Sequence, residues 1–87
     1  MFGEDAYRTL GLKAAALFSS LAQNHPLFDG NKRLSWILTL AFLRLNGYRV
    51  VMENDEAFDL VLQVTQRQME LDQIAAVLVG NMVGSDD

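Results

Sequence analysis

The segment that decides the fold is residues 31–46, NKRLSWILTLAFLRLN. Apolar side chains recur in it at intervals of three and four residues, which is the spacing of one face of an α-helix. They are Leu34, Ile37, Leu38, Ala41, Phe42 and Leu45. Trp36, Leu40 and Leu43 fill the opposite side as well. We therefore expect a helix over residues 31–46 that is buried nearly all round.

The segment before it has the same periodicity. We expect a helix from Leu10 to Asn24, with Thr9 as its N-cap. Its inner positions are Leu10, Ala14, Leu17, Phe18, Leu21 and Ala22. Its solvent-facing positions are Lys13, Ser20 and Gln23. The chain then passes to the next helix through a short polar connection.

After Gly47, which suits the left-handed end of a helix, the sequence predicts three further elements. Tyr48–Met52 is a short β-prone stretch that extends or pairs as a hairpin. Asn54 caps a helix from Asp55 to Gln68, and a last helix runs from Leu71 to Met82. The inner face of the third helix is formed by Phe58, Val61, Leu62 and Thr65. The expected fold class is all-α, with one domain over residues 1–83 and a solvated tail at 84–87.

A helix that is apolar on every side needs cover on every side, and three amphipathic neighbours in 87 residues are too few. We expect a missing N-terminal segment or a partner chain to supply the cover. A homodimer is the simplest partner.

Composition excludes several classes of protein. There is no cysteine and a single histidine, so the chain alone can form neither a disulfide nor a zinc site of the usual kind. Acidic residues near Met1 and short apolar runs argue against a signal peptide and a membrane span, and we expect a cytoplasmic protein. The net charge of −4 disfavours nucleic-acid binding. Most of the basic residues nevertheless lie in the first 50 positions.

One polar cluster, residues 24–33 (NHPLFDGNKR), is explained by neither an amphipathic face nor a cap. Gly30 and Asn31 stand where a helix begins, and free backbone amides there bind anions. Lys32 and Arg33 add positive charge for phosphate oxygens. Asp29 is placed to hold Mg²⁺ against the same phosphates. His25 has the side chain best suited to act as a general base near neutral pH.

Residues 25–33, HPLFDGNKR, resemble the signature of the Fic/Doc family in its death-on-curing form, with lysine after asparagine. The resemblance covers nearly the whole chain and implies a compact helical fold, here without the family's N-terminal helical region. It also implies transfer of a phosphate-containing group from a nucleotide such as ATP, with Mg²⁺, to a hydroxyl of a target protein. His25 would be the catalytic base, Asp29 the metal ligand, and Gly30, Asn31, Lys32 and Arg33 the nucleotide-binding residues.

By the same resemblance the chain is a toxin that phosphorylates a target such as translation elongation factor Tu and is neutralised by a cognate antitoxin. Two positions depart from the family pattern. Leu27 replaces a buried phenylalanine, and Trp36 stands where adenylyl-transferring members carry a second arginine. The second departure favours phosphoryl transfer over adenylyl transfer, which stays open. A third interpretation is an inactive helical interaction module. Trp36 is expected to lie in the core rather than to stack on a nucleotide.

Overall fold

The computed structural model describes residues 2–24 and 30–84. Over these ranges it contains four α-helices and two short strands. In chain order they are α1 (Phe2–Asn24), α2 (Gly30–Leu45), β1 (Tyr48–Val50), α3 (Asn54–Thr65), α4 (Leu71–Gly80) and β2 (Met82–Gly84). The expected all-α class is confirmed. His25 and Asp29 lie outside the described residues.

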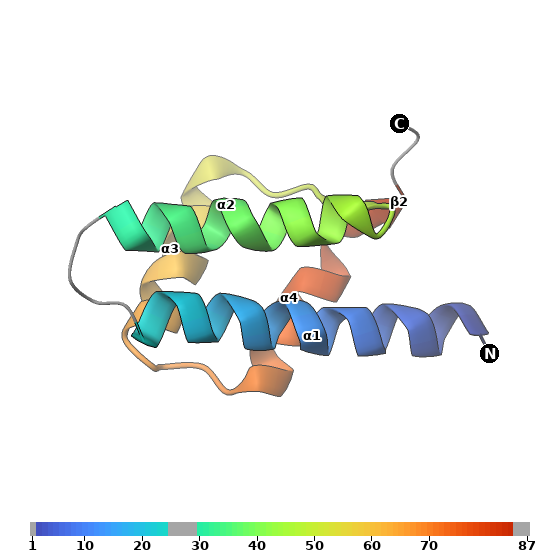
Figure 1. Cartoon of the computed structure of the whole chain (residues 1–87), viewed down its shortest axis with the longest axis horizontal. Coiled ribbons are helices and arrows are strands. Elements are labelled where there is room, and N and C mark those ends of the chain that lie inside the picture. The colour runs from blue at the N-terminus through green and yellow to red at the C-terminus, as the bar shows by residue number, and fades with distance from the viewer. Residues whose placement is uncertain (1, 25–29, 85–87) are drawn as a thin grey trace.

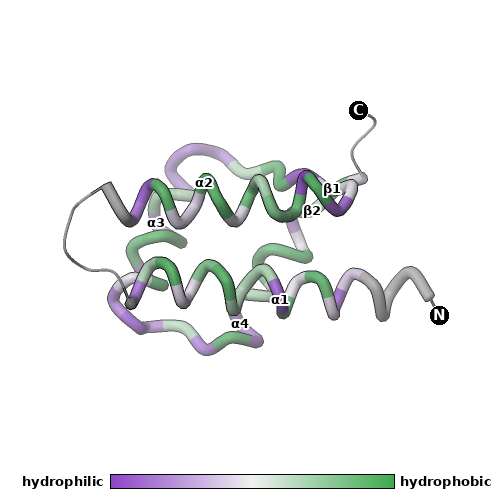
Figure 2. Tube along the Cα trace, in the orientation of Figure 1, coloured by the Kyte–Doolittle hydropathy of each residue, from purple (hydrophilic) through white to green (hydrophobic). Residues whose placement is uncertain are grey.

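The longest helix, α1, is the centre of the fold and contacts α2, α3 and α4. Figure 1 shows α1 and α2 side by side and running in opposite directions, with α3 and α4 behind them. The buried side chains of α1 are mostly small: Phe18 is accompanied by Ala14, Ala15 and Ala22. Small side chains let neighbouring helices approach closely, and the Phe18 ring fills the space between them, 5.3 Å from the ring of Trp36. Hydrophobic positions recur along both long helices (Figure 2).

The two strands pair with each other and tie the C-terminal end of the chain to the end of α2. They are antiparallel, with Tyr48 opposite Gly84 and Val50 opposite Met82. The predicted β-prone stretch is thus correct in type, but its partner is the segment after α4 rather than a local hairpin strand. Met82, expected in the last helix, belongs to β2 and not to α4. Gly84, expected in the tail, is the last residue of β2.

Several helix boundaries also differ from the prediction. Since α1 begins at Phe2, Thr9 lies inside the helix and cannot cap it. The N-cap of α3 is Glu53 and not Asn54. The backbone amide of Glu53 donates to the Glu56 carboxylate at 3.2 Å. This reciprocal pairing is a capping box, which satisfies two free amides at once. α3 ends at Thr65 rather than Gln68, because Arg67 turns the chain with a φ of 60°.

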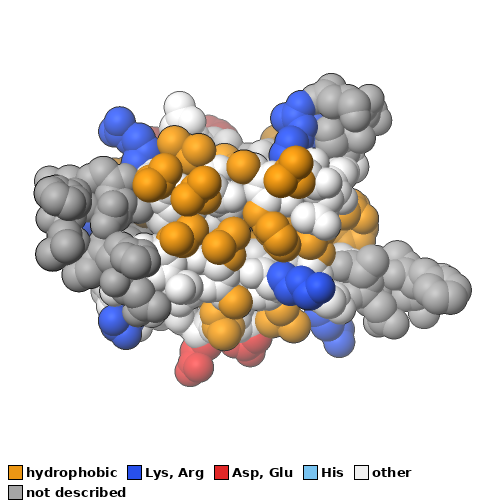
Figure 3. Space-filling model, in the orientation of Figure 1, with side chains coloured by type: hydrophobic (Ala, Val, Ile, Leu, Met, Phe, Trp, Pro, Cys, Tyr) orange, Lys and Arg blue, Asp and Glu red, His pale blue; other side chains and the backbone are white. Residues whose placement is uncertain are grey.

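The expectation that residues 31–46 are buried all round is wrong. α2 buries Ser35, Thr39 and Leu43 against its neighbours. The two hydroxyls are satisfied within the helix, donating to the carbonyls of Lys32 at 2.6 Å and Ser35 at 2.7 Å. The opposite face is left to solvent, and it carries Leu34, Ile37, Leu38 and Leu45. Figure 3 shows hydrophobic side chains gathered over this side of the molecule.

Two further side chains lie on the opposite side of their helix from the prediction. Phe58, expected in the core, is 64% exposed, because α3 turns Leu60, Val61 and Val64 inward. Gln23, expected in solvent, is partly buried and donates to the Val64 carbonyl at 2.9 Å. No helix in the described part of the chain is long and apolar enough to cross a membrane.

Candidate functional site

The polar cluster singled out in the sequence leads directly into α2. This helix begins at Gly30, one residue before the predicted start, and Asn31, Lys32 and Arg33 follow in its first turn. Lys32 is half-buried and Arg33 is exposed. The structure therefore brings the helix start and the two cations together as predicted. The roles given to His25 and Asp29 stay predictions, since both lie outside the described residues.

The charge at the start of α2 is unusual for a helix. α3 and α4 carry acidic residues in their first turns, which interact favourably with the positive end of the helix dipole. The first turn of α2 has none and carries Lys32 and Arg33 instead. Positive side chains here are repelled by the positive end of the helix dipole, so they lower the stability of the helix when no anion is bound. A bound phosphate would be attracted by the amides and both side chains together.

A cavity of about 320 Å³ opens beside these two cations, between α2 and α3. Lys32, Arg33 and Trp36 line it from α2. The α3 side is formed by residues spaced three and four apart along one helix face: Asn54, Ala57, Phe58, Val61 and Leu62. Sequence reasoning missed the α3 side of this cavity. An aromatic residue on an amphipathic helix was assigned to the core, and nothing local in the sequence indicated otherwise.

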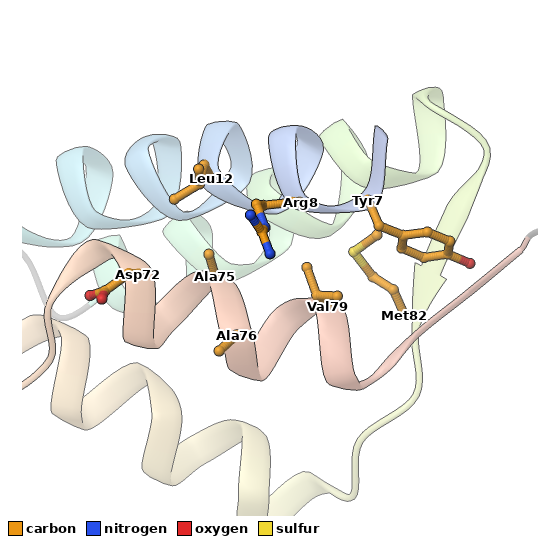
Figure 4. Close-up of a pocket in the computed structure, with 8 residues that line it drawn as sticks. All are labelled: Tyr7, Arg8, Leu12, Asp72, Ala75, Ala76, Val79 and Met82. Atoms are coloured by element: carbon orange, nitrogen blue, oxygen red, sulfur yellow. The ribbon is translucent and has the colours of Figure 1, made fainter. Parts of the chain in front are cut away.

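A larger cavity of about 720 Å³ lies between α1 and α4. Figure 4 shows Arg8 directed from α1 toward α4, with Ala75, Ala76 and Val79 along the α4 side and Asp72 toward the start of that helix. Its lining is mainly apolar. None of the motif residues lines it. The larger cavity is lined by one cation, Arg8, whereas the smaller one is lined by the pair Lys32 and Arg33. The smaller cavity is therefore the better candidate for binding a phosphate group.

The metal ligand expected from the sequence, Asp29, lies outside the described residues. Within residues 2–24 and 30–84 no group of three or more Asp, Glu or His side chains could hold a metal ion. Mg²⁺ usually takes only one or two protein carboxylates and completes its shell with phosphate and water. A single carboxylate near the start of α2, such as Asp29, suits that mode of binding.

Comparison with known proteins agrees with the motif. The model of the Fic/DOC family matches residues 3–43, which span α1, the motif and most of α2. The chain is also 48% identical over 82 residues to a protein of Mycolicibacterium smegmatis (strain ATCC 700084 / mc(2)155) named Toxin Doc. That alignment covers 92% of this chain and 63% of the relative, so the chain spans less than two thirds of the relative's length. Over α1, the motif and most of α2 the chain is therefore similar to the Fic/DOC family, and over most of its length it is similar to a death-on-curing toxin.

Proposed function

We propose that this chain is a Doc-like toxin that transfers the γ-phosphoryl group of a nucleotide to a hydroxyl of a target protein. The observation that carries the proposal is the first turn of α2, where Lys32 and Arg33 replace the acidic residues found in α3 and α4. Such a helix start is stabilised by a bound phosphate group. The relative named Toxin Doc supports the toxin assignment.

In the proposed reaction His25 removes the proton from the target hydroxyl. The hydroxyl oxygen then forms a bond to the γ-phosphorus, the bond from that phosphorus to the bridging oxygen breaks, and the nucleoside diphosphate leaves. The amides of Gly30 and Asn31 hold the oxygens of the transferred group. Lys32 and Arg33 offset the charge of the phosphates. Asp29 would hold Mg²⁺, which neutralises phosphate charge.

The position of Trp36 favours transfer of the γ-phosphoryl group over transfer of the adenylyl group. For adenylyl transfer the α-phosphate must lie at the helix start, and the other two phosphates extend away and need a cation of their own. Trp36 stands at the position of that cation in adenylyl-transferring members. Its ring packs 5.3 Å from the ring of Phe18 and supplies no positive charge.

The proposal implies three partners. The donor is ATP or another nucleotide, bound with Mg²⁺. The acceptor is a protein hydroxyl, of the translation elongation factor Tu type by the family resemblance. A cognate antitoxin restrains the toxin, again by the family resemblance.

The deciding experiment incubates the chain with bacterial lysate and ATP labelled at either the α or the γ position. Phosphoryl transfer labels a protein band only from the γ position, and His25→Ala serves as the control that must abolish the band. A band labelled only from the α position would show adenylyl transfer instead. No His25-dependent band from either label would favour an inactive helical module.

A further inference from the structure

Phe58 is a large aromatic side chain that lies outside the hydrophobic core. It is 64% exposed, although α3 has an apolar face turned toward the core. It lies one helical turn from Asn54 and one from Leu62, on the face of α3 that looks toward the start of α2. Exposing a ring of this size forgoes burial of apolar area, so a ligand that covers it would be bound favourably.

We propose that the cavity between α2 and α3 binds the base and sugar of the donor nucleotide, and that the base stacks on Phe58. This inference rests on the proposed function, since it assigns the part of the same nucleotide that the phosphate-binding residues do not hold. The cavity measures about 320 Å³, at the lower end of the range of about 300–1,000 Å³ for small-molecule sites. It is therefore sized for a nucleoside, with the phosphates outside it.

The lining of the cavity fits the two chemically different ends of a nucleotide. Lys32 and Arg33 lie at the cavity from the α2 side, where they meet phosphate charge. Phe58, Val61 and Leu62 present aromatic and aliphatic surface to a flat base. Asn54 contributes an amide, which both donates and accepts hydrogen bonds and so can pair with a base edge.

Phe58 is better placed for stacking than the other aromatic residue of the cavity. The ring of Trp36 is engaged with Phe18 and belongs partly to the core. Phe58 has no ring contact of this kind among the described residues. Stacking on an aromatic ring tolerates any base, because every base has a π-face. ATP and GTP should therefore both depend on Phe58.

The test measures binding of ATP and of inorganic tripolyphosphate, each with Mg²⁺, by titration calorimetry. Tripolyphosphate carries the charge of the ATP tail without base or sugar. Phe58→Ala should weaken ATP binding about tenfold and leave tripolyphosphate binding unchanged, whereas Phe58→Trp should retain ATP affinity. Leu71→Ala, which truncates an exposed apolar residue on α4, is the matched control and should bind both ligands as the parent chain does.

The outcomes separate this inference from the proposed function. Equal ATP affinity in Phe58→Ala and the parent chain, while the parent still labels its target, would overturn the base site and leave the transferase standing. Equal loss of ATP and tripolyphosphate binding in Phe58→Ala would also overturn it, since the ring would then act on the fold or the phosphates. A parent chain that binds neither ligand would refute both proposals.

Discussion

The charges of Lys32 and Arg33 are expected to strengthen nucleotide binding and to lower the stability of the chain without nucleotide. They lie in the first turn of α2, where positive charge repels the helix dipole. We expect the Lys32→Ala, Arg33→Ala double variant to bind nucleotide more weakly and with less dependence on salt, because fewer charges are screened. Without nucleotide it should unfold at equal or higher temperature, with a gain below about 1 kcal/mol in free energy of unfolding.

Calorimetric titrations at two salt concentrations and a thermal melt measure both effects. Lys13→Ala is a suitable control, since this lysine is exposed on α1 and remote from the first turn of α2 in sequence. Unchanged nucleotide affinity in the double variant would refute the phosphate-binding role of the pair.

His25 carries a different expectation, because a general base acts on the chemical step. We predict that His25→Ala lowers the rate of transfer about 10²–10⁴-fold and leaves nucleotide affinity nearly unchanged. Single-turnover labelling measures the rate, and calorimetry measures the affinity. A variant that loses binding and rate in equal proportion would assign His25 to nucleotide binding rather than to proton transfer.

The candidate site could be predicted from sequence only where its residues are contiguous. Gly30, Asn31, Lys32 and Arg33 were found because a helix start and its charges are local features. Phe58 was not, because its exposure depends on how α3 is rotated about its own axis against α1 and α2. Apolar spacing marks two adjoining stripes on α3, and only packing decides that Leu60 and Val64 lie inside.

At the scale of elements, the contact between α1 and α4 depends on a glycine. A Cβ atom at Gly11 would lie 2.5 Å from Cγ2 of Val79, closer than packed atoms allow. Val79 is β-branched and has little rotamer freedom in a helix, so it cannot easily move aside. We predict that Gly11→Ala lowers the free energy of unfolding by about 1 kcal/mol, because overpacking at about 1–3 kcal/mol exceeds the gain in helix propensity of about 1 kcal/mol.

Chemical denaturation measures this difference, and two further variants give it meaning. Gly80→Ala is the matched control, since an added Cβ there meets nothing within 4 Å. In a Val79→Ala background the clash is removed, so Gly11→Ala should become stabilising. A loss of stability that persists in that background would point to a cause other than contact with Val79.

The helices were predictable because their periodicity is local, but the sheet and several boundaries were not. β1 pairs with β2, which lies more than thirty residues later, and each strand has only three residues. Nothing in Tyr48–Val50 alone selects that partner. The end of α3 was misplaced for a similar reason, since its turn uses Arg67 with a positive φ where the usual signal is glycine.

At the scale of the whole molecule, the two faces of α2 differ sharply. One face contacts α1 and α3, while the other exposes large apolar side chains, with Ile37 52% and Leu45 88% exposed. In the described part of the chain α2 lies at the edge of the fold, with α1 beside it and α3 behind it (Figure 1). An exposed apolar face of this kind marks an interaction surface.

We predict that the 87-residue chain forms a two-fold homodimer in solution, in which the exposed face of α2 packs against the same face of a second copy. In a two-fold contact both copies use the same face, so each apolar side chain meets an apolar partner and no other kind of surface is needed. Light scattering and sedimentation over a concentration series measure the mass. Ile37→Lys and Leu38→Lys place charge within the contact and should yield monomers, whereas Val51→Lys, at an exposed apolar position outside α2, should not. A parent chain that stays monomeric at high concentration would show that water, and not a second copy, covers this face.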